Sequence, residues 1–298
     1  MKSARPIILT RVIALVLALT VCVQVGAVRY QCGDFVYDCN YVMGHCEATL
    51  MRYAGTDTDV TIPETVEYQG NTYPIIYIGD EFSSPFALNA TVRSVSLPAN
   101  AQQVGTEAFF GCQQLRSVDL GAGLTDIGAY AFADCPQLEQ VTIRPKLTAI
   151  GAYAFARCTS LSTLTLGRTV QRIGAYAFDG TPLTSLIVLR TEPALCDGPL
   201  SSTNLYSNCT LYVHIGCRGA FMTTGSEWSR FENIIERPEP GDLNQDGATD
   251  ISDVNLLINV LLGREYLEQS VGDLDHNGTI DIADINIVLN LLLGRIEN

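Results

Sequence analysis

From Val92 to Leu183, apolar and polar residues recur along the chain with a period of 23 positions. The copies begin with apolar residues at their first, fourth and sixth positions, as in LRSVDL, LEQVTI and LSTLTL. Side chains along a strand alternate between its two faces, so each segment is predicted to be a strand with one buried side. The residues predicted to point inward are Val118, Leu120, Val141, Ile143, Leu164 and Leu166.

The second half of each copy has a glycine and a phenylalanine at fixed places. The glycines are predicted to mark a turn, and the phenylalanines to enter the core. A single unit of this size cannot bury its own apolar side, so neighbouring units are expected to stack around a continuous core. The sequence therefore predicts a β-rich solenoid. The residues concerned are Gly105, Gly128, Gly151, Gly174, Phe109, Phe132, Phe155 and Phe178.

The repeat pattern L..V.L......IG..AF..C resembles the BspA-like leucine-rich repeat of bacterial surface proteins. The resemblance covers roughly residues 55–237, from an opening segment that includes DVTIPETVEYQG to a closing segment that begins TLYVHIG. His214 stands where the closing segment usually has proline. The family implies a leucine-rich-repeat solenoid across 92–237, and we expect 28–91 to form an N-terminal cap of strands with a first irregular repeat.

The outward strand positions of the repeats are mostly short and able to form hydrogen bonds. They suit contact with a protein or glycan surface, although the same composition is typical of any solvated strand. Both interpretations stay open. The candidate ligand-binding residues are Arg93, Ser94, Ser96, Arg116, Ser117, Asp119, Glu139, Gln140, Thr142, Ser162, Thr163 and Thr165.

Tyr130, Tyr153 and Tyr176 recur at the repeat period. A row of aromatic rings can hold sugars, but a row with this spacing more often forms a structural stack between turns. We expect the structural role.

The C-terminal region holds two copies of one acidic motif, GDLNQDGATDISD and GDLDHNGTIDIAD, offset by 31 residues. Oxygen-bearing residues at positions one, three, five, nine and twelve, with glycine at six, are typical of an EF-hand calcium loop, and position seven supplies a carbonyl. The motif predicts two calcium ions. The proposed ligands are Asp242, Asn244, Asp246, Ala248, Asp250, Asp253, Asp273, Asp275, Asn277, Thr279, Asp281 and Asp284.

A helix is predicted after each loop, because apolar residues recur there at helical spacing. Pro238 and Pro240 make a helix before the first loop unfavourable. The two helices are expected to pack through their apolar faces. Those faces comprise Val254, Leu257, Ile258, Leu261, Leu262, Ile285, Val288, Leu289, Leu292 and Leu293.

A loop followed by one helix, repeated after 31 residues, resembles a type I dockerin over residues 241–294. The resemblance implies a small all-α calcium-binding module (241–298, after a linker at 238–240) that docks calcium-dependently onto a cohesin on a scaffold protein. The family's recognition dyad corresponds to Ile251-Ser252 and Ile282-Ala283, which depart from the common Ser-Thr pair. Other apolar residues form either a partner patch or a second core. They are Leu256, Val260, Ile287 and Leu291.

Residues 1–27 have the features of an export signal, with basic residues ahead of an apolar run and a small-residue ending at Ala27. A membrane anchor is the alternative, but the run is short for a span of about 20 residues. We expect a secreted or cell-surface protein. Export would permit disulfides in the outer cysteine groups (Cys32, Cys39, Cys46; Cys196, Cys209, Cys217), whereas Cys112, Cys135 and Cys158 follow the repeat and are predicted to be packed inside.

The net charge of −14 argues against nucleic acid as a partner, because phosphate binding needs a basic surface. Over residues 241–298, eleven Asp and Glu face two arginines, as a calcium-binding segment would require.

An enzyme is the rival to a binding protein, because dockerins commonly carry glycan-degrading enzymes. Glycoside hydrolysis needs two carboxylates placed in a cleft, and no such constellation is evident outside the tail. We therefore predict a non-catalytic adhesion protein that binds a host or bacterial surface protein or glycan through the solenoid. The alternatives are a structural cell-surface spacer without a docking partner, and an accessory protein of a polysaccharide-degrading complex.

Overall fold

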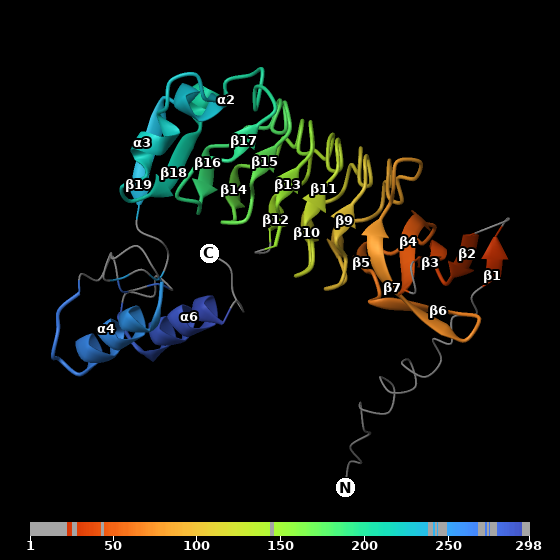
Figure 1. Cartoon of the computed structure of the whole chain (residues 1–298), viewed down its shortest axis with the longest axis horizontal. Helices are drawn as coiled ribbons and strands as arrows, with labels where there is room; N and C mark the ends of the chain where they lie inside the picture. The colour runs from red at the N-terminus through yellow and green to blue at the C-terminus, as the bar shows by residue number, and fades with distance from the viewer. Residues whose placement is uncertain are drawn as a thin grey trace, which may run out of the picture.

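The structure is a computed structural model that describes residues 23–25, 29–42, 45–143, 146–237, 241, 243, 249–267, 272, 274 and 279–293. Its main body is an elongated solenoid whose turns follow one another in chain order (Figure 1). The described part of the C-terminal module contains two short helices, α4 (Ile251–Leu261) and α6 (Ile282–Leu292).

The N-terminal part of the solenoid is an antiparallel meander. Strands β1 (Val23–Val25), β2 (Arg29–Cys32), β3 (Phe35–Val42) and β4 (His45–Tyr53) pair in sequence order, and β4 pairs in parallel with β7 (Asn71–Ile78). A hairpin joins β6 (Thr65–Tyr68) to β7. The same sheet continues into the repeats through β7, so these strands cover the N-terminal end of the stacked core.

One side of the solenoid, here called the front face, consists of parallel strands in two four-stranded sheets. The first contains β5 (Asp59–Thr61), β8 (Ser94–Ser96), β10 (Ser117–Asp119) and β12 (Gln140–Thr142). The second contains β14 (Thr163–Leu166), β16 (Ser185–Val188), β18 (Thr210–His214) and β19 (Asn233–Arg237). Successive repeats thus present equivalent residues side by side.

The opposite side is a ladder of two-residue parallel strands that extends the N-terminal sheet. These strands are β9 (Gln103–Val104), β11 (Asp126–Ile127), β13 (Ala149–Ile150), β15 (Arg172–Ile173) and β17 (Leu195–Cys196). Each repeat therefore contributes one strand to each side, with its turn residues between them.

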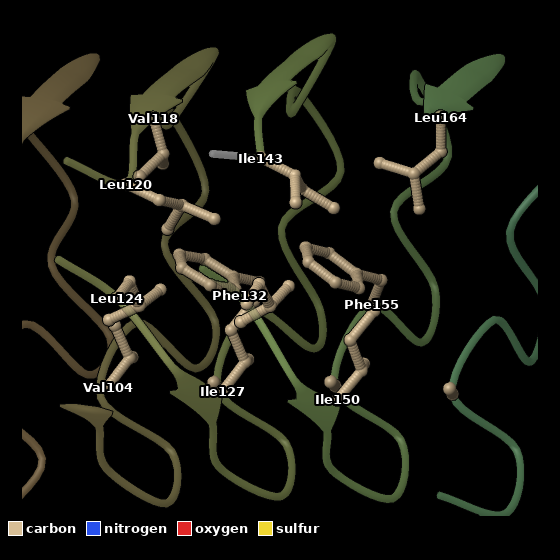
Figure 2. Close-up of a cluster of buried hydrophobic side chains, with 14 of the residues drawn as sticks. Val104, Val118, Leu120, Leu124, Ile127, Phe132, Ile143, Ile150, Phe155 and Leu164 are labelled. Atoms are coloured by element: carbon tan, nitrogen blue, oxygen red, sulfur yellow. The ribbon is translucent and has the colours of Figure 1, made fainter. Parts of the chain in front are cut away.

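The core lies between these two sides (Figure 2). Five of the six residues predicted to point inward are buried, and Val141 is half-buried at the place where the front face divides into two sheets. Phe109, Phe132 and Phe155 stack in one column with ring centroids 5.0 and 5.3 Å apart. The predicted solenoid and its aromatic positions are confirmed.

The turns begin at the predicted glycines, because Ala131 donates to the Gly128 carbonyl and Ala154 to the Gly151 carbonyl. The glycine of each repeat is required by close approach: a Cβ on Gly128 would lie 2.6 Å from the carbonyl carbon of Gly105 in the previous repeat. The left-handed backbone that bends the chain occurs instead at non-glycine residues such as Tyr130 (φ 56°) and Asp134 (φ 58°). That conformation costs free energy in non-glycine residues, so the stacked repeats must hold it in place.

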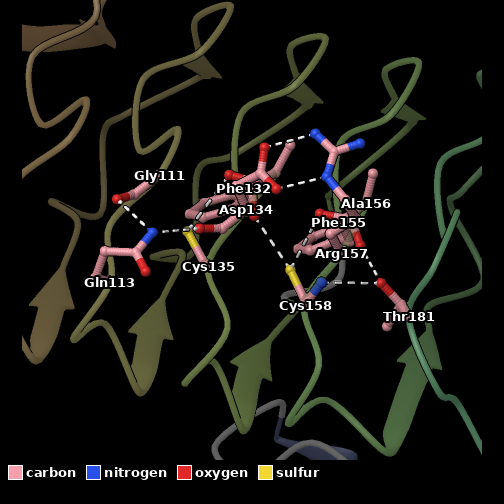
Figure 3. Close-up of polar contacts among 11 residues, drawn as sticks. Gly111, Gln113, Phe132, Asp134, Cys135, Phe155, Ala156, Arg157, Cys158 and Thr181 are labelled. Atoms are coloured by element: carbon pink, nitrogen blue, oxygen red, sulfur yellow. Dashed lines mark hydrogen bonds and ion pairs between the residues drawn. The ribbon is translucent and has the colours of Figure 1, made fainter.

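The three cysteines of the repeats form a buried ladder, and Figure 3 shows two of them, Cys135 and Cys158. Each Sγ donates a hydrogen bond of 3.1 Å to a phenylalanine carbonyl 26 residues earlier: Cys112 to Phe86, Cys135 to Phe109 and Cys158 to Phe132. Thr181 takes the equivalent place in the next repeat and donates to Phe155. Burial raises the pKa of the Cys158 thiol to about 12, as expected for a thiol that packs rather than reacts.

The outer cysteine groups form no disulfide bonds within either group. Cys39, Cys46, Cys196, Cys209 and Cys217 carry free thiols, while Cys32 is disulfide-bonded. Burial raises the pKa of Cys196 and of Cys209 to about 12, so these two thiols also favour the neutral form.

The last repeats are closed by a segment with α2 (Leu205–Asn208), α3 (Arg218–Phe221) and the 3-10 helix η1 (Glu227–Arg230). Trp228, the single tryptophan of the chain, is buried there and donates from Nε1 to the Ala194 carbonyl at 2.7 Å. Strand β18 runs through His214 and pairs with β19. The closing sheet therefore forms with histidine at the position where the family usually has proline.

The C-terminal module has the two predicted helices, and half of the predicted packing face takes part in its core, since Val254, Leu257 and Val288 are buried in it and Ile285 and Leu289 pack against it. Leu243, Val254, Leu257 and Val288 are buried together, and leucines from outside the helices, Leu267 and Leu274, pack against them. The other half of the predicted packing face stays outside this core. The exposed members are Ile258 (38%), Leu261 (40%), Leu262 (59%), Leu292 (38%) and Leu293 (61%).

Strand β1 lies within the segment 1–27 that the sequence marks as an export signal. It pairs antiparallel with β2, with Val23 opposite Gln31 and Val25 opposite Arg29. Removal of residues 1–27 would therefore leave β2 as the outer strand of the sheet. None of the helices within the described residues is long and apolar enough to cross a membrane.

The cysteine ladder predicts how substitutions in the repeats affect stability. Cys135→Ala removes the hydrogen bond to the Phe109 carbonyl and should lower the free energy of unfolding by about 1–3 kcal/mol, because a buried carbonyl loses its donor. Cys135→Thr should be milder, because Thr181 already makes the same bond. Urea unfolding of both variants would check this. An equal loss of free energy of unfolding in both variants would contradict a stabilising role for these hydrogen bonds.

Candidate functional site: the front face and the acidic tail

The twelve candidate residues of the solenoid all lie on the front face or at its strand starts, and all are exposed or half-buried. Cross-strand register arranges them in rows. One row runs through Ser94, Ser117 and Gln140, and the next through Ser96, Asp119 and Thr142. The predicted alternation is confirmed, and it places hydroxyl, amide and carboxylate groups at neighbouring strand positions.

Strand β5 adds Asp59 to the row of Ser94, a residue that the sequence analysis did not assign to the front face. Asp59 pairs with Ser94 and accepts a hydrogen bond from its hydroxyl at 2.5 Å. This bond, together with one from Thr58, holds the pKa of Asp59 below its usual value. The segment DVTIP has the same alternation as SVSLP in the next strand, and that likeness could have revealed the extra strand.

At its far end the front face changes character. The row of Thr165 continues through Ile187, Tyr212 and Ile235 on adjacent strands. Ile187 and Tyr212 are half-buried, and 48% of Ile235 is exposed. These residues lay beyond the repeats whose outward positions the sequence reading assigned, so it named none of them.

The tyrosine row is a structural stack. Rings of Tyr130 and Tyr153 lie 4.8 Å apart with planes 2° from parallel, and those of Tyr153 and Tyr176 lie 5.1 Å apart. Both faces of Tyr153 are therefore covered by its neighbours, and a sugar could reach only the ring edges. The stack favours the structural interpretation.

Charged side chains beside this stack are already engaged (Figure 3). Arg157 forms a two-pronged ion pair with Asp134, and this hydrogen bonding holds the pKa of Asp134 below its usual value. Asp179, one repeat further, accepts hydrogen bonds from Ser202. We assign these residues to repeat stacking rather than to a ligand site.

In the C-terminal module, each helix begins with a reciprocal cap. Asp250 accepts from the Ser252 amide, and Asp281 accepts from the Ala283 amide. The last position of each acidic motif then reaches back: Asp253 accepts from the Asp250 amide at 2.9 Å, and Asp284 from the Asp281 amide at 2.8 Å. The hydrogen bond from Ser252 lowers the pKa of Asp250.

Asp253 and Asp284 also tie each loop to its helix. Their second carboxylate oxygen accepts the backbone amide of Leu243 or Leu274 at 2.7 Å, and both side chains are fully buried. A buried carboxylate is costly unless it is paired or bound to a metal. Position twelve of each predicted calcium motif is thus a buried carboxylate that accepts backbone hydrogen bonds.

Only part of the predicted calcium set can be placed. Asp250, Asp253, Thr279, Asp281 and Asp284 lie among the described residues, where no group of three or more His, Cys, Asp or Glu clusters as a metal site. The remaining predicted ligands lie outside the described residues. These are Asp242, Asn244, Asp246, Ala248, Asp273, Asp275 and Asn277.

The predicted docking residues divide into two groups. Ile251 and Ile282 are 61% and 68% exposed, at equivalent positions of α4 and α6. Leu256 packs against the module core, which favours the second-core interpretation for that residue. The others are half-buried, namely Ser252, Val260, Ala283, Ile287 and Leu291.

Comparison with known proteins agrees with this architecture. Residues 83–211 match a family model described as a BspA type leucine-rich repeat region, in six copies. We call residues 83–211 the BspA-type region. The match indicates no catalytic family and does not extend into the C-terminal module. No curated protein matches the chain.

Several solved structures are similar to this chain over part of its length. The pneumococcal vaccine antigen PcpA is 20% identical with a TM-score of 0.51, over 65% of this chain and 52% of its own. The T. pallidum leucine-rich repeat protein is 20% identical with a TM-score of 0.48, over 68% and 80%. A leucine-rich cell surface protein of Faecalibacterium prausnitzii is 22% identical with a TM-score of 0.42, over 72% and 56%. Such identities speak for the fold alone.

Asp253 accepts hydrogen bonds from the Leu243 and Asp250 amides, and we call this arrangement the carboxylate clasp. It yields a prediction for the C-terminal module. Asp253→Asn leaves one side-chain oxygen for two backbone amides, which should cost about 1–3 kcal/mol. For a module this small, about 1 kcal/mol corresponds to about 4–8 °C in melting temperature. Calorimetry of the full chain in calcium buffer would measure it. Glu265→Gln, an exposed change of equal charge, is the control; equal melting of the two variants would contradict the clasp.

Proposed function

We propose that the chain is an exported, non-catalytic binding protein. The front face of its leucine-rich-repeat solenoid binds a protein or glycan surface, and its acidic C-terminal module attaches it, with calcium, to a cohesin-type scaffold. The observation that carries the adhesive part is the registered array of exposed hydroxyl, amide and carboxylate groups over parallel strands of the BspA-type region.

The geometry of the front face supports binding of an extended surface rather than a small molecule. Its groups repeat from strand to strand instead of converging on one point, and neighbouring parallel strands lie about 4.8 Å apart. A partner would therefore make many modest contacts. Arg93 and Arg116 at the strand starts, with Asp119 and Glu139, add charges of both signs that would select among partners.

Calcium is proposed for the C-terminal module because its donor set is made of hard oxygens. Asp250, Asp253, Asp281 and Asp284 would each supply carboxylate oxygen, and Thr279 a backbone carbonyl, with the other predicted ligands completing each site. The bound ion would offset the charge of the buried Asp253 and Asp284 carboxylates. The caps and clasps of the chain itself position these carboxylates at the helix starts.

The docking role rests on two exposed isoleucines in equivalent places. Ile251 and Ile282 project at the first turn of α4 and α6, beside the proposed calcium sites. A partner that covered both residues would gain the burial of their apolar surface. Calcium would fix both helix starts and so present the isoleucines to a cohesin.

Two other roles use the same features. In a surface spacer, calcium stabilises the module and no partner follows. In an accessory protein of a polysaccharide-degrading complex, the solenoid holds the substrate while catalysis is supplied by other chains on the scaffold. The experiment below separates the spacer from both docking roles.

The docking proposal predicts calcium-dependent binding to purified type I cohesin domains. The chain comprising residues 28–298 would be immobilised, and binding followed by interferometry with calcium and then with chelator. Binding should occur with calcium and be lost with chelator. Asp242→Ala with Asp273→Ala should abolish binding, because each proposed site loses its first ligand.

A second pair of variants separates docking from metal binding. Ile251→Asp with Ile282→Asp should weaken cohesin binding at least about tenfold, or 1.4 kcal/mol, without changing calcium affinity. Tyr266→Ser, at a residue that is 85% exposed, is the matched control and should bind normally. Failure of a calcium-loaded, folded chain to bind any cohesin would favour the spacer.

A further inference from the structure

Two arginines lie next to each other where adjacent strands of the front face begin. Arg93 directly precedes β8 and Arg116 directly precedes β10, and both residues are exposed. The backbone amide of Arg116 donates to the Arg93 carbonyl at 2.7 Å, so the two residues are held about one strand spacing, 4.8 Å, apart. The Arg93 amide donates in turn to the Thr58 carbonyl at 2.6 Å. The repeat backbone therefore anchors the two arginines as neighbours.

The protein itself does not neutralise this arginine pair. Among the residues that the structure describes, neither side chain forms an ion pair or a hydrogen bond. The carboxylate on the preceding strand, Asp59, is occupied by hydroxyls: Ser94 donates to Oδ1 and Thr58 to Oδ2. These two hydroxyls lower the pKa of Asp59 most, and Arg93 contributes less. Both guanidinium groups are thus left for an anion that reaches the face from outside.

The chemistry of two adjacent guanidinium groups selects a carboxylate or a similar planar anion. Each guanidinium presents its N–H donors as a fork that matches the two oxygens of a carboxylate. Two like charges held side by side also repel each other, and a single anion between Arg93 and Arg116 removes that repulsion. The arginine pair is therefore suited to one acidic group rather than to a neutral one.

The rest of the face does not suit a protein partner. Every outward residue of β5, β8, β10, β12 and β14 is polar, as in Ser94 and Ser96 on β8 or Thr163 and Thr165 on β14. The buried centres of protein interfaces are instead rich in aromatic residues and methionine and poor in serine and aspartate. A ligand for these strands must bring hydroxyl and amide groups of its own, as a glycan does.

Glu139 sets a limit on how acidic the ligand can be. Its amide donates to the Arg116 carbonyl at 2.8 Å, so it is the next residue in the same line, and it is exposed. Its carboxylate repels a second anion placed there but accepts hydrogen bonds from hydroxyl groups. Gln140, also exposed, follows it on β12. The line thus favours an acidic group followed by a neutral, hydroxyl-bearing group.

We propose that the front face binds a linear acidic glycan in which a carboxylated sugar alternates with a neutral sugar. The chain of sugars runs across the strands, with a carboxylate over Arg93 and Arg116 and the hydroxyls of the next sugar over Glu139 and Gln140. This inference rests on the proposed adhesive role of the face and names the class of glycan that it takes.

Binding of residues 28–298 to four probes of similar length, measured by calorimetry in calcium buffer, tests the inference. The probes are a hyaluronan oligosaccharide, in which glucuronate alternates with N-acetylglucosamine, a neutral cellulose oligosaccharide, a heparin oligosaccharide and a polyglutamate peptide. Hyaluronan should bind at least about tenfold more tightly than each of the others. Added salt should weaken its binding, because the contacts involve exposed charges.

Two pairs of substitutions test the role of the arginines. Arg93→Gln with Arg116→Gln should weaken hyaluronan binding at least about tenfold, and Arg93→Lys with Arg116→Lys should have an intermediate effect, because lysine keeps the charge but not the fork. Arg52→Gln with Arg218→Gln is the matched control. It makes the same change in net charge at exposed positions outside the front face and should bind normally. Circular dichroism confirms that each variant is folded.

Glu139→Gln tests the order of groups along the line. Removing this carboxylate should raise the affinity for the densely sulfated heparin probe several-fold relative to hyaluronan, because the repulsion of a second anion is lost. An unchanged ratio of the two affinities would contradict the placement of the neutral sugar over Glu139.

The inference is overturned if hyaluronan does not bind, if the neutral oligosaccharide or the peptide binds as tightly, or if the glutamine pair binds like the control pair. These results differ from failure of the adhesive role itself. Binding of the neutral oligosaccharide or the peptide alone would leave an adhesive face with another ligand class. Failure of all four probes to bind a folded chain would contradict both proposals.

Discussion

The close stacking of successive repeats is the constraint on which the rest of the solenoid depends. Ring centroids of Phe109, Phe132 and Phe155 lie 5.0 and 5.3 Å apart, and a Cβ on Gly128 would collide with the repeat before it. At this separation the turns can exchange backbone hydrogen bonds, such as the one from Phe132 to the Ala154 carbonyl at 2.8 Å. Those bonds hold the left-handed backbone at Tyr130 and Asp134, which is unfavourable for the residues themselves. Alignment of the strands, and with it the array on the front face, follows from the same spacing.

The repeats and the C-terminal module are stabilised in different ways. The repeats bury one long core in which each unit supports its neighbours. The C-terminal module has a small core around Leu257 and Val288 and relies on carboxylates that cap helices and clasp loops. Burying Asp253 and Asp284 makes sense where a cation compensates their charge. Binding calcium would then be inseparable from folding the module, while the repeats would be indifferent to it.

Sequence alone predicted what depends on periodicity. The 23-residue repeat identified the inward residues, the phenylalanine column and the packed cysteines, because each recurs where neighbouring units must match. It did not identify Asp59 or the Ile187, Tyr212 and Ile235 row, because these belong to irregular repeats at the two ends. It marked where the turns begin, but not why glycine is needed there, which at Gly128 is the close approach of the previous repeat. Helix periodicity placed α4 and α6 and half of their packing residues correctly, but it could not foresee that Leu243, Leu267 and Leu274 from outside the helices would join the same core.

The most direct test of this account is hydrogen exchange of the full chain with and without calcium, resolved by peptide. The account predicts that chelation removes protection from amides in α4 and α6 and from those of Leu243 and Leu274, while protection in β10, β12 and β14 stays unchanged. Unchanged protection in α4 and α6 after complete removal of calcium would contradict the claim that the ion folds the module. Loss of protection in the repeats as well would contradict the separation of the two cores.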